Sequence, residues 1–344
     1  MTFHTLYFSQ ESSLIIQYYL SVSSLSMSVF WLVNDPRYFW DHTNLPPGRT
    51  LRKRQQMQSL VTHAAALLPA DGVAVEFCSG GGYVGLALAW CRPDATVYLT
   101  DMNAVSLSFA RQRAQAMGLG NVRYVRAELS ELVTVAQQIQ VKEEEVGVEV
   151  GEASPGNEFP KSHRDPRVSA SDGASAVERA GRRCDGEGPD EAIMMLSRMT
   201  LGVALHACGP ATDVVHQLCL DRRASFVLSP CCYGFLQHWA DGSEGRFAVS
   251  FPRSVAFKRS GCTRLWFSAL CSCADRTFWS HDSRADAHNA AGMEAMRAVD
   301  TDRLMAAKER GYTVCPHIMV PPSASTKNHI LVGHPDSKSK KVQF

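Results

Sequence analysis

Short apolar runs alternate with helical patterns across residues 73–125. The runs at 73–77, 96–100 and 121–125 are the length of buried strands, while 83–91 and 104–117 repeat their apolar positions at helical spacing. Strand, helix, strand, helix, strand within about fifty residues is typical of a right-handed, parallel α/β arrangement. The strands are continuously apolar, as expected when both faces of a sheet are covered. A helix pattern at 51–68 precedes them.

The same rhythm returns in the second half of the chain. Apolar runs at 201–205 and 224–228 enclose a helix pattern at 213–220. A less regular region follows, and then a helix at 301–310 and two runs at 312–319 and 329–332 that fit an antiparallel hairpin. We therefore predict an α/β fold with a doubly wound, mostly parallel, seven-stranded sheet of the Rossmann-like kind.

Residues 141–191 interrupt the pattern. This segment has few aliphatic residues and is rich in glycine, serine, proline and charge, so it cannot bury enough apolar area to offset its ordering entropy. We interpret it as a disordered insertion in one domain at 51–335, because three strands cannot close a core alone; the alternative is a linker between two domains. An extension at 1–50 and a basic tail at 336–344 flank the domain.

Composition gives limited information about the partners and the location of the protein. A net charge of +1 does not produce the strong positive field that is typical of proteins that bind nucleic acids. Eleven cysteines without an evident signal peptide favour free thiols in a reducing compartment, and hence a cytoplasmic location. Residues 14–33 are apolar enough to suggest a membrane span, but they contain Gln17 and several serines and lack flanking cations. We favour an extension there, and membrane contact through 1–33 stays open.

A glycine-rich loop follows the first strand. Gly80, Gly82 and Gly85 match the dinucleotide fingerprint, and Asp101 has about the spacing of the acid that binds a ribose. Nicotinamide dinucleotides and S-adenosylmethionine both need a loop without side chains and an acid at the end of the second strand. Asp101 has an alternative role, since it or Asn103 could cap the next helix.

Glu76 is the residue that distinguishes between these two cofactors. It lies at the end of the first strand, where a carboxylate would repel a pyrophosphate but attract the cationic methionine end of S-adenosylmethionine. A glutamate without a ligand is the alternative. Glu128 follows the third strand, where folds of this topology contact the adenine. The charge pattern favours S-adenosylmethionine, bound by Glu76, Cys78, Gly80, Gly82, Asp101, Glu128 and His206.

The fourth and fifth strands bring reactive side chains to the same edge of the sheet. His206 is a candidate general base, with a structural histidine as the even alternative. Tyr233 and Asp213 are candidates to hold the acceptor, although an acid in the first turn of a helix also interacts with the helix dipole. Cys208, Gly209, Cys231, Cys232 and Tyr233 are expected to line the substrate pocket.

Four residues at this edge are of types that bind zinc: His206, Cys208, Cys231 and Cys232. Adjacent cysteines rarely chelate one tetrahedral ion with good geometry, and the chain has no Cys-x-x-Cys motif. Burial as small apolar thiols is the default, so no metal is predicted.

Several longer stretches carry a family resemblance. They are 52–56 (Arg-Lys-Arg-Gln-Gln), 77–82, 202–209 with 211–213, 230–235 (Pro-Cys-Cys-Tyr-Gly-Phe) and 327–328. On these the chain resembles, over about 52–333, the methyltransferase domain of the glutathione S-transferase C-terminal domain-containing protein family, without the transferase-like domain, which 50 residues cannot hold. The resemblance implies a class I methyltransferase that uses S-adenosylmethionine.

A more distant resemblance suggests the substrate. His206, Cys208, Gly209, Asp213 and the paired cysteines are similar to eukaryotic tRNA acceptor-stem ribose 2′-O-methyltransferases, although Tyr-Gly follows the pair here. Together with basic clusters at 52–54, 258–259 and 338–341, it favours RNA. A protein substrate is the alternative. Cys78 in place of the first glycine also leaves a non-catalytic scaffold open, and a nicotinamide-dependent dehydrogenase is a further rival.

Overall fold

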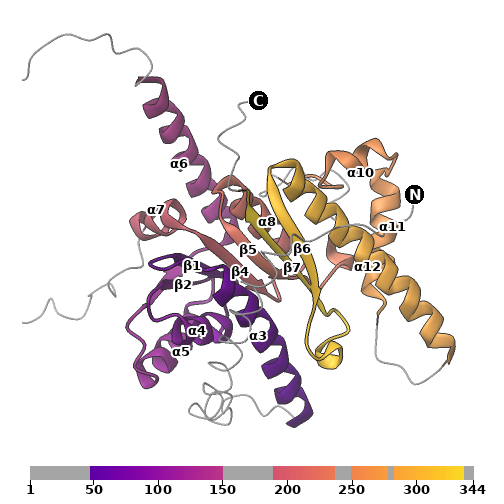
Figure 1. Ribbon diagram of the computed structural model, residues 1–344, viewed down its shortest axis with the longest axis horizontal. Helices are drawn as coiled ribbons and strands as arrows, with labels where there is room; N and C mark the ends of the chain where they lie inside the picture. Colours follow the sequence, from indigo (N-terminus) through magenta and orange to yellow (C-terminus); the bar gives the residue numbers. More distant parts are fainter. Residues whose placement is uncertain (1–46, 150–188, 237–248, 278–282, 337–344) are drawn as a thin grey trace, which may run out of the picture.

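One mixed sheet of seven strands organises the molecule. The computed structural model describes residues 47–149, 189–236, 249–277 and 283–336 (Figure 1). The strand order is β3-β2-β1-β4-β5-β7-β6. The strands are β1 (Val73–Phe77), β2 (Thr96–Asp101), β3 (Val122–Arg126), β4 (Leu201–Leu205), β5 (Ser225–Ser229), β6 (Tyr312–Ile318) and β7 (His329–Pro335).

The pairing confirms the predicted fold class. β1 pairs in parallel with β2 and β4, β2 with β3, and β4 with β5, whereas β7 runs antiparallel to both β5 and β6. The order reverses at β1, since the chain moves outward through β2 and β3 and then returns to β4 on the other side. Ligands in such a sheet bind beyond the carboxyl ends of the strands at this switch point.

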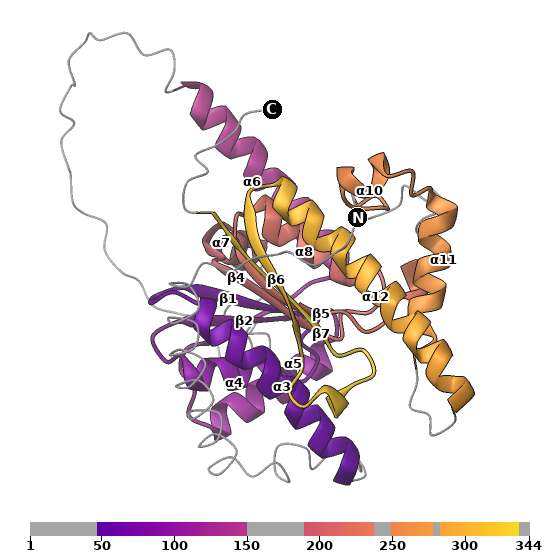
Figure 2. The same ribbon diagram turned by 45° about the vertical axis from the view of Figure 1, so that its right-hand side comes forward.

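Helices cover both faces of the sheet (Figures 1 and 2). The strand residues alternate between the two layers: Val97 and Leu99 of β2 pack on one side and Tyr98 on the other. The first layer contains α3 (Pro47–Leu67), α4 (Tyr83–Cys91) and α5 (Ala104–Ala116). The second contains α6 (Leu129–Glu149), α7 (Pro189–Arg198), α8 (Ala211–Asp221) and the C-terminal part of α12 (Ser283–Glu309).

The region before residue 301 is more regular than expected. The sequence predicted an irregular stretch, but α10 (Val255–Arg259), α11 (Arg264–Asp275) and most of α12 lie there. Phe267, Cys271 and Ala274 form one buried face of α11, and they pack with Met296 of α12 in a separate small core. That prediction was wrong because exposed apolar residues, Leu265 and Trp266, stand directly beside the buried ones in α11 and obscure the helical spacing.

Two helices reach into the segment that the sequence predicts to be an insertion. α6 continues to Glu149 and α7 begins at Pro189, so both ends of 141–191 are helical. Glutamate and lysine are good helix formers, and Glu143 extends α6 against the body of the domain by binding Arg222 at 2.9 and 3.2 Å. Residues 150–188, the extension at 1–46 and the tail at 337–344 lie outside the described residues.

Among the helices described, none has the length and apolarity to cross a membrane.

Candidate functional site

The glycine loop turns the chain sharply at the carboxyl end of β1. Cys78, Gly80 and Gly82 have left-handed φ angles of 52°, 52° and 73°. At Gly82 a Cβ would lie 2.6 Å from Leu99 Cδ1, so a side chain is excluded there by both sterics and backbone. At Gly80 a Cβ would meet nothing within 4 Å, so the loop surface faces open space. A ligand can therefore approach the backbone at Gly80.

Asp101 ties the loop to the second strand. Its Oδ2 accepts a hydrogen bond from the Gly80 amide at 2.8 Å, and its Oδ1 accepts one from the Asn103 amide at 2.8 Å. The cap of α5 is Asn103, whose side chain accepts from the Val105 and Ser106 amides. Each carboxylate oxygen can accept a second hydrogen bond. Asp101 is thus placed and partnered as a ribose-binding acid should be.

Glu76 lies beneath the loop and is almost fully buried. Its Oε2 accepts a hydrogen bond from the Gly85 amide at 2.8 Å, which serves the first turn of α4, because the N-cap residue Gly82 has no side chain to do so. Burial raises the pKa of Glu76 to about 8, and the nearby charge of Asp101 adds to this shift. The contact with a cationic cofactor that the sequence suggested stays a prediction.

The raised pKa of Glu76 predicts a pH-dependent stability. Its folded value of about 8 exceeds the ordinary 4.5, so its contribution is complete below pH 4.5 and is lost as the pH rises through 8. Glu76→Gln keeps an acceptor for Gly85 and cannot ionise. We expect wild type to lose free energy of unfolding relative to this variant between pH 5 and 8.5, at about 1.4 kcal/mol per pKa unit. Urea unfolding at several pH values measures the difference.

The prediction concerns the difference in free energy of unfolding between wild type and Glu76→Gln. His63 and His206 have lowered pKa values and change the stability of both proteins in the opposite direction, so they cancel. A wild-type-minus-variant difference that is flat with pH would contradict the assignment.

The loop fits S-adenosylmethionine in three further respects. Ser79 Oγ is buried and has no hydrogen-bond partner within the described part of the chain, so it is available to a ligand. Met102, directly after Asp101, is 63% exposed and offers an apolar surface to an adenine ring. The Cys78 thiol stays neutral, because burial raises its pKa to about 12. Met102 was missed in the sequence; an apolar residue directly after the ribose acid was the available signal.

Glu128 lies further along the same edge and is exposed. Its amide donates to Glu131 Oε2 at 2.7 Å, the side-chain-to-backbone half of a capping box at the start of α6. Its own carboxylate accepts from Ser130 Oγ at 3.3 Å. The adenine contact predicted for Glu128 therefore stays a prediction.

His206 directly follows β4 and has a left-handed conformation, with φ at 66°. Its Nε2 lies 3.2 Å from Gln56 Oε1, and Gln56 Nε2 donates to the Ala324 carbonyl at 2.7 Å. Because a carbonyl only accepts, Gln56 is oriented, and its oxygen requires a proton on His206 Nε2. Nδ1 then keeps its lone pair. Partial loss of hydration and the charge of Lys53 lower the pKa of His206 to about 4, so the ring is neutral at pH 7.

Two residues of α3 belong to this site and were missed as such. Lys53 and Gln56 are three residues apart and so share a face of the helix. Gln56 contacts His206, and Lys53 Nζ lies 5.8 Å from the centre of the Tyr83 ring beside the glycine loop. The sequence indicated only a basic cluster at 52–54, whereas the three-residue spacing of Lys53 and Gln56 was the signal for a shared helix face.

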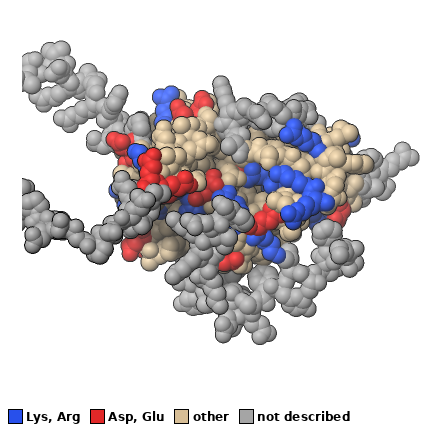
Figure 3. All heavy atoms as spheres, turned by 90° about the horizontal axis from the view of Figure 1, so that it is seen from above, with Lys and Arg blue, Asp and Glu red and all other residues tan. Residues whose placement is uncertain are grey.

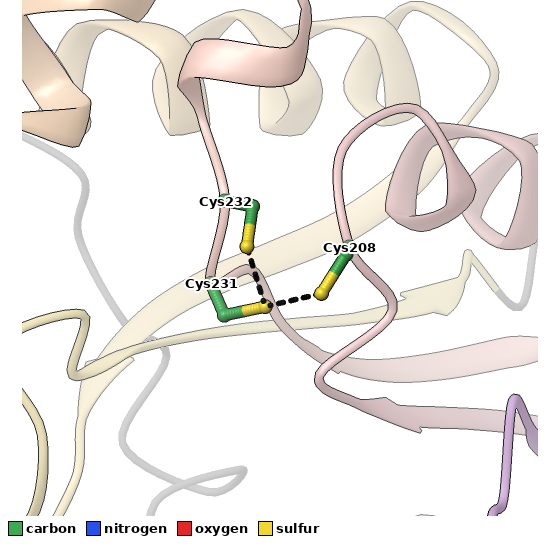
Figure 4. A group of neighbouring side chains, drawn as sticks. All are labelled: Cys208, Cys231 and Cys232. Atoms are coloured by element: carbon green, nitrogen blue, oxygen red, sulfur yellow. Dashed lines mark hydrogen bonds between the residues drawn. The ribbon is translucent and has the colours of Figure 1, made fainter.

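Three thiols meet where β4 and β5 end (Figure 4). Cys231 Sγ lies 3.4 Å from Cys208 Sγ and 3.5 Å from Cys232 Sγ, and all three atoms are within 4.8 Å of one another. A hydrogen bond from Cys231 lowers the pKa of Cys208 to about 6, and the same contact raises the pKa of Cys231. Neighbouring side chains of a strand point to opposite faces, but β5 ends at Ser229, before the pair, so Cys231 and Cys232 are not bound by this alternation.

Asp213 and Tyr233 are placed differently from the prediction. Both are fully buried. Arg303 binds the Asp213 carboxylate at 2.7 and 3.0 Å, and the Tyr233 hydroxyl donates to Asp300 Oδ2 at 2.7 Å. Neither group is accessible to an acceptor, so their predicted role is corrected to a structural one. Gly209, with φ at 58°, lies in the turn that leads from Cys208 to α8.

Comparison with known proteins adds an independent result. A family model described as a methyltransferase domain matches residues 52–238. The glutathione S-transferase C-terminal domain-containing protein of Bos taurus is 31% identical over 290 residues, which are 83% of this chain and 34% of that protein. The chain thus spans about a third of that relative.

Two further matches are shorter or more distant. Ribosomal RNA small subunit methyltransferase G of Neisseria gonorrhoeae is 39% identical over 61 residues, which are 18% of this chain and 30% of that protein. Among solved structures, the SAH-bound methyltransferase PaMTH1 of Podospora anserina aligns over 98% of this chain and 100% of its own, with 11% identity and a TM-score of 0.39.

Proposed function

The chain belongs to the methyltransferase-domain family, and from this premise we propose that it transfers the methyl group of S-adenosylmethionine to RNA. The observation that carries RNA as the substrate is the corner between α10 and α11, an exposed surface that combines cations with an aromatic ring. A relative named for ribosomal RNA matches a short part of the chain, in keeping with this proposal.

The α10–α11 corner consists of Lys258, Arg259, Arg264, Leu265 and Trp266. The three cations are exposed, Leu265 is 80% exposed and Trp266 is 68% exposed. In the view from above, Lys and Arg side chains gather on the half of the surface where α10–α12 lie (Figure 3). Cations that follow phosphates, beside an aromatic ring on which a base can stack, are the usual means of binding single-stranded RNA.

The corner is connected to the reactive edge of the sheet. α11 packs against the 3-10 turn Gly234–Leu236, which follows Cys232 almost directly. In addition, the Tyr233 amide donates to Asp275 Oδ1, in the last turn of α11, at 3.1 Å. α11 therefore carries the corner in its first turn and contacts the segment after β5 from its last turn, about 14 Å further along the helix.

Different residues of the chain would bind the cofactor and accept the proton in this reaction. Bound S-adenosylmethionine supplies an electrophilic methyl group. Asp101 and the backbone around Gly80 hold and orient the cofactor, and Ser79 Oγ offers it a further hydrogen bond. His206 is neutral with a free Nδ1, so it can take the proton that the acceptor loses, although a pKa of about 4 makes it a weak base.

Transfer of labelled methyl into separated RNA and protein fractions tests the proposal. We expect label in RNA, and none in either fraction with Asp101→Ala. Label that enters only protein would make protein the substrate. Cofactor binding without any transfer would indicate a scaffold, and binding of a nicotinamide dinucleotide that improves in Glu76→Ala would indicate a dehydrogenase.

The corner itself has a separate test. Trp266→Ala is expected to weaken binding of single-stranded RNA about 5- to 150-fold, the equivalent of about 1–3 kcal/mol for one stacked base. The matched control is Met194→Ala, another exposed apolar side chain, on α7 at the opposite side of the molecule (Figure 1). Arg264→Ala should lower the salt slope of binding by about one. Equal RNA affinity in Trp266→Ala and the control would remove the corner as the RNA surface.

A further inference from the structure

The three thiols at the ends of β4 and β5 have an arrangement that the methyl-transfer reaction does not explain. Cys208 comes from the loop after β4, and Cys231 and Cys232 come from the segment after β5. The sulfur of Cys231 lies between the other two, and all three point toward one another (Figure 4). Within the described ranges, this is the group whose ligand atoms are close enough to share one ion.

We propose that Cys208, Cys231 and Cys232 form a zinc site with three thiolate ligands and one open coordination position. The inference does not depend on RNA as the substrate. A tetrahedral ion with zinc–sulfur bonds of about 2.3 Å separates its sulfur ligands by about 3.8 Å. The separations of 3.4 and 3.5 Å, with every pair within 4.8 Å, are close to this value. Small side-chain rotations bring the three atoms to the required spacing.

The ligand set selects the ion. Sulfur ligands without a carboxylate favour zinc or copper(I) over magnesium, calcium or manganese. Three protein ligands leave the fourth position of a tetrahedral zinc ion to water or to an oxygen, nitrogen or sulfur atom of a substrate, as in catalytic zinc sites. Cys208 is exposed, so the ion can enter from solvent.

The side chains around the three thiols suit a zinc site that carries a net negative charge. Three thiolates and one zinc ion carry a net charge of −1. Lys327 is near enough to interact electrostatically with Cys231 and Cys232, and its Nζ lies 5.8 Å from the centre of the Tyr233 ring. Cys208 is also near enough to Cys78 of the glycine loop to interact with it electrostatically, so the thiol site and the loop lie at the same edge of the sheet.

Zinc binding by the full chain tests the site. The protein is purified under a thiol reductant, stripped with a chelator and titrated with zinc against a chromophoric competitor. Cys208→Ser, Cys231→Ser and Cys232→Ser are each expected to weaken one zinc equivalent by more than the 10- to 100-fold that is typical of losing an outer-shell partner. Cys273→Ser, a half-buried thiol outside the cluster, is the matched control and should retain it.

Cobalt(II) gives a second readout that counts ligands. Wild type should show the thiolate-to-cobalt absorption of three sulfur ligands, and each cluster variant should lose about a third of its intensity. Urea unfolding without metal shows whether the variants are folded. The proposal is overturned if reduced wild type binds no more zinc than Cys208→Ser, or if alkylation and mass spectrometry find Cys208 joined to Cys231 as a disulfide under the same reducing conditions.

Discussion

Replacement of Asp101 by alanine should lower the affinity for S-adenosylmethionine by about 100-fold or more. Hydrogen bonds to a charged group are worth about 1.5–3 kcal/mol each, and the two hydroxyls of a ribose diol can each donate one to the carboxylate. The substitution also releases the Gly80 amide at 2.8 Å and the Asn103 amide at 2.8 Å, so the loop and the start of α5 lose their common anchor. Calorimetry with the methylated and demethylated cofactors measures the change.

Two further variants sharpen this experiment. Asp94→Ala removes an exposed carboxylate that pairs with Arg92 in the turn before β2, and it should leave the affinity unchanged. Asp101→Asn keeps one acceptor oxygen and should give an intermediate affinity. If Asp101→Ala binds either cofactor as tightly as Asp94→Ala does, Asp101 is only part of the loop and does not hold the ribose.

The sheet was predictable from the sequence because its signals are local. The strands β1, β4 and β5 are short, mainly apolar runs, and the glycine loop marks which end of β1 carries the site. Asp101 was predicted as the ribose-binding acid for the same reason, since its spacing from the loop is set by one helix and one strand.

The acceptor side of the site was less predictable, because its partners are distant in sequence. Asp213 is bound by Arg303, which is 90 residues away in the sequence. No local sequence pattern around either residue predicts that they pair. The thiol cluster depends on how the chain turns after Ser229, where neither strand nor helix periodicity applies. Residues at element ends with long-range partners are those for which local patterns give the least information.

Arg303→Met should lower the free energy of unfolding by about 3–5 kcal/mol, because it removes the cation that the buried carboxylates of Asp213 and Asp300 share, and leaves Asp213 with the more distant Arg253 at 3.7 Å. Arg303 is 1% exposed. Its guanidinium binds Asp213 at 2.7 and 3.0 Å and Asp300 at 2.9 Å. Asp300 in turn accepts hydrogen bonds from Tyr233 and His329, so the arginine supports a network that joins α8, α12, β7 and the segment after β5. Urea unfolding at pH 7 measures the loss.

Arg297→Met is the matched control, since Arg297 lies on the same helix and forms an exposed ion pair with Glu294. Exposed pairs contribute about 0–1 kcal/mol, so the control should unfold almost as wild type does. A double variant, Arg303→Met with Asp213→Leu, removes one of the stranded charges and should recover part of the loss, because buried ion pairs are often replaceable by apolar residues of similar size. If Arg303→Met is no less stable than Arg297→Met, the buried pair does not stabilise the fold, and the position of Tyr233 beside Cys232 must depend on apolar packing instead.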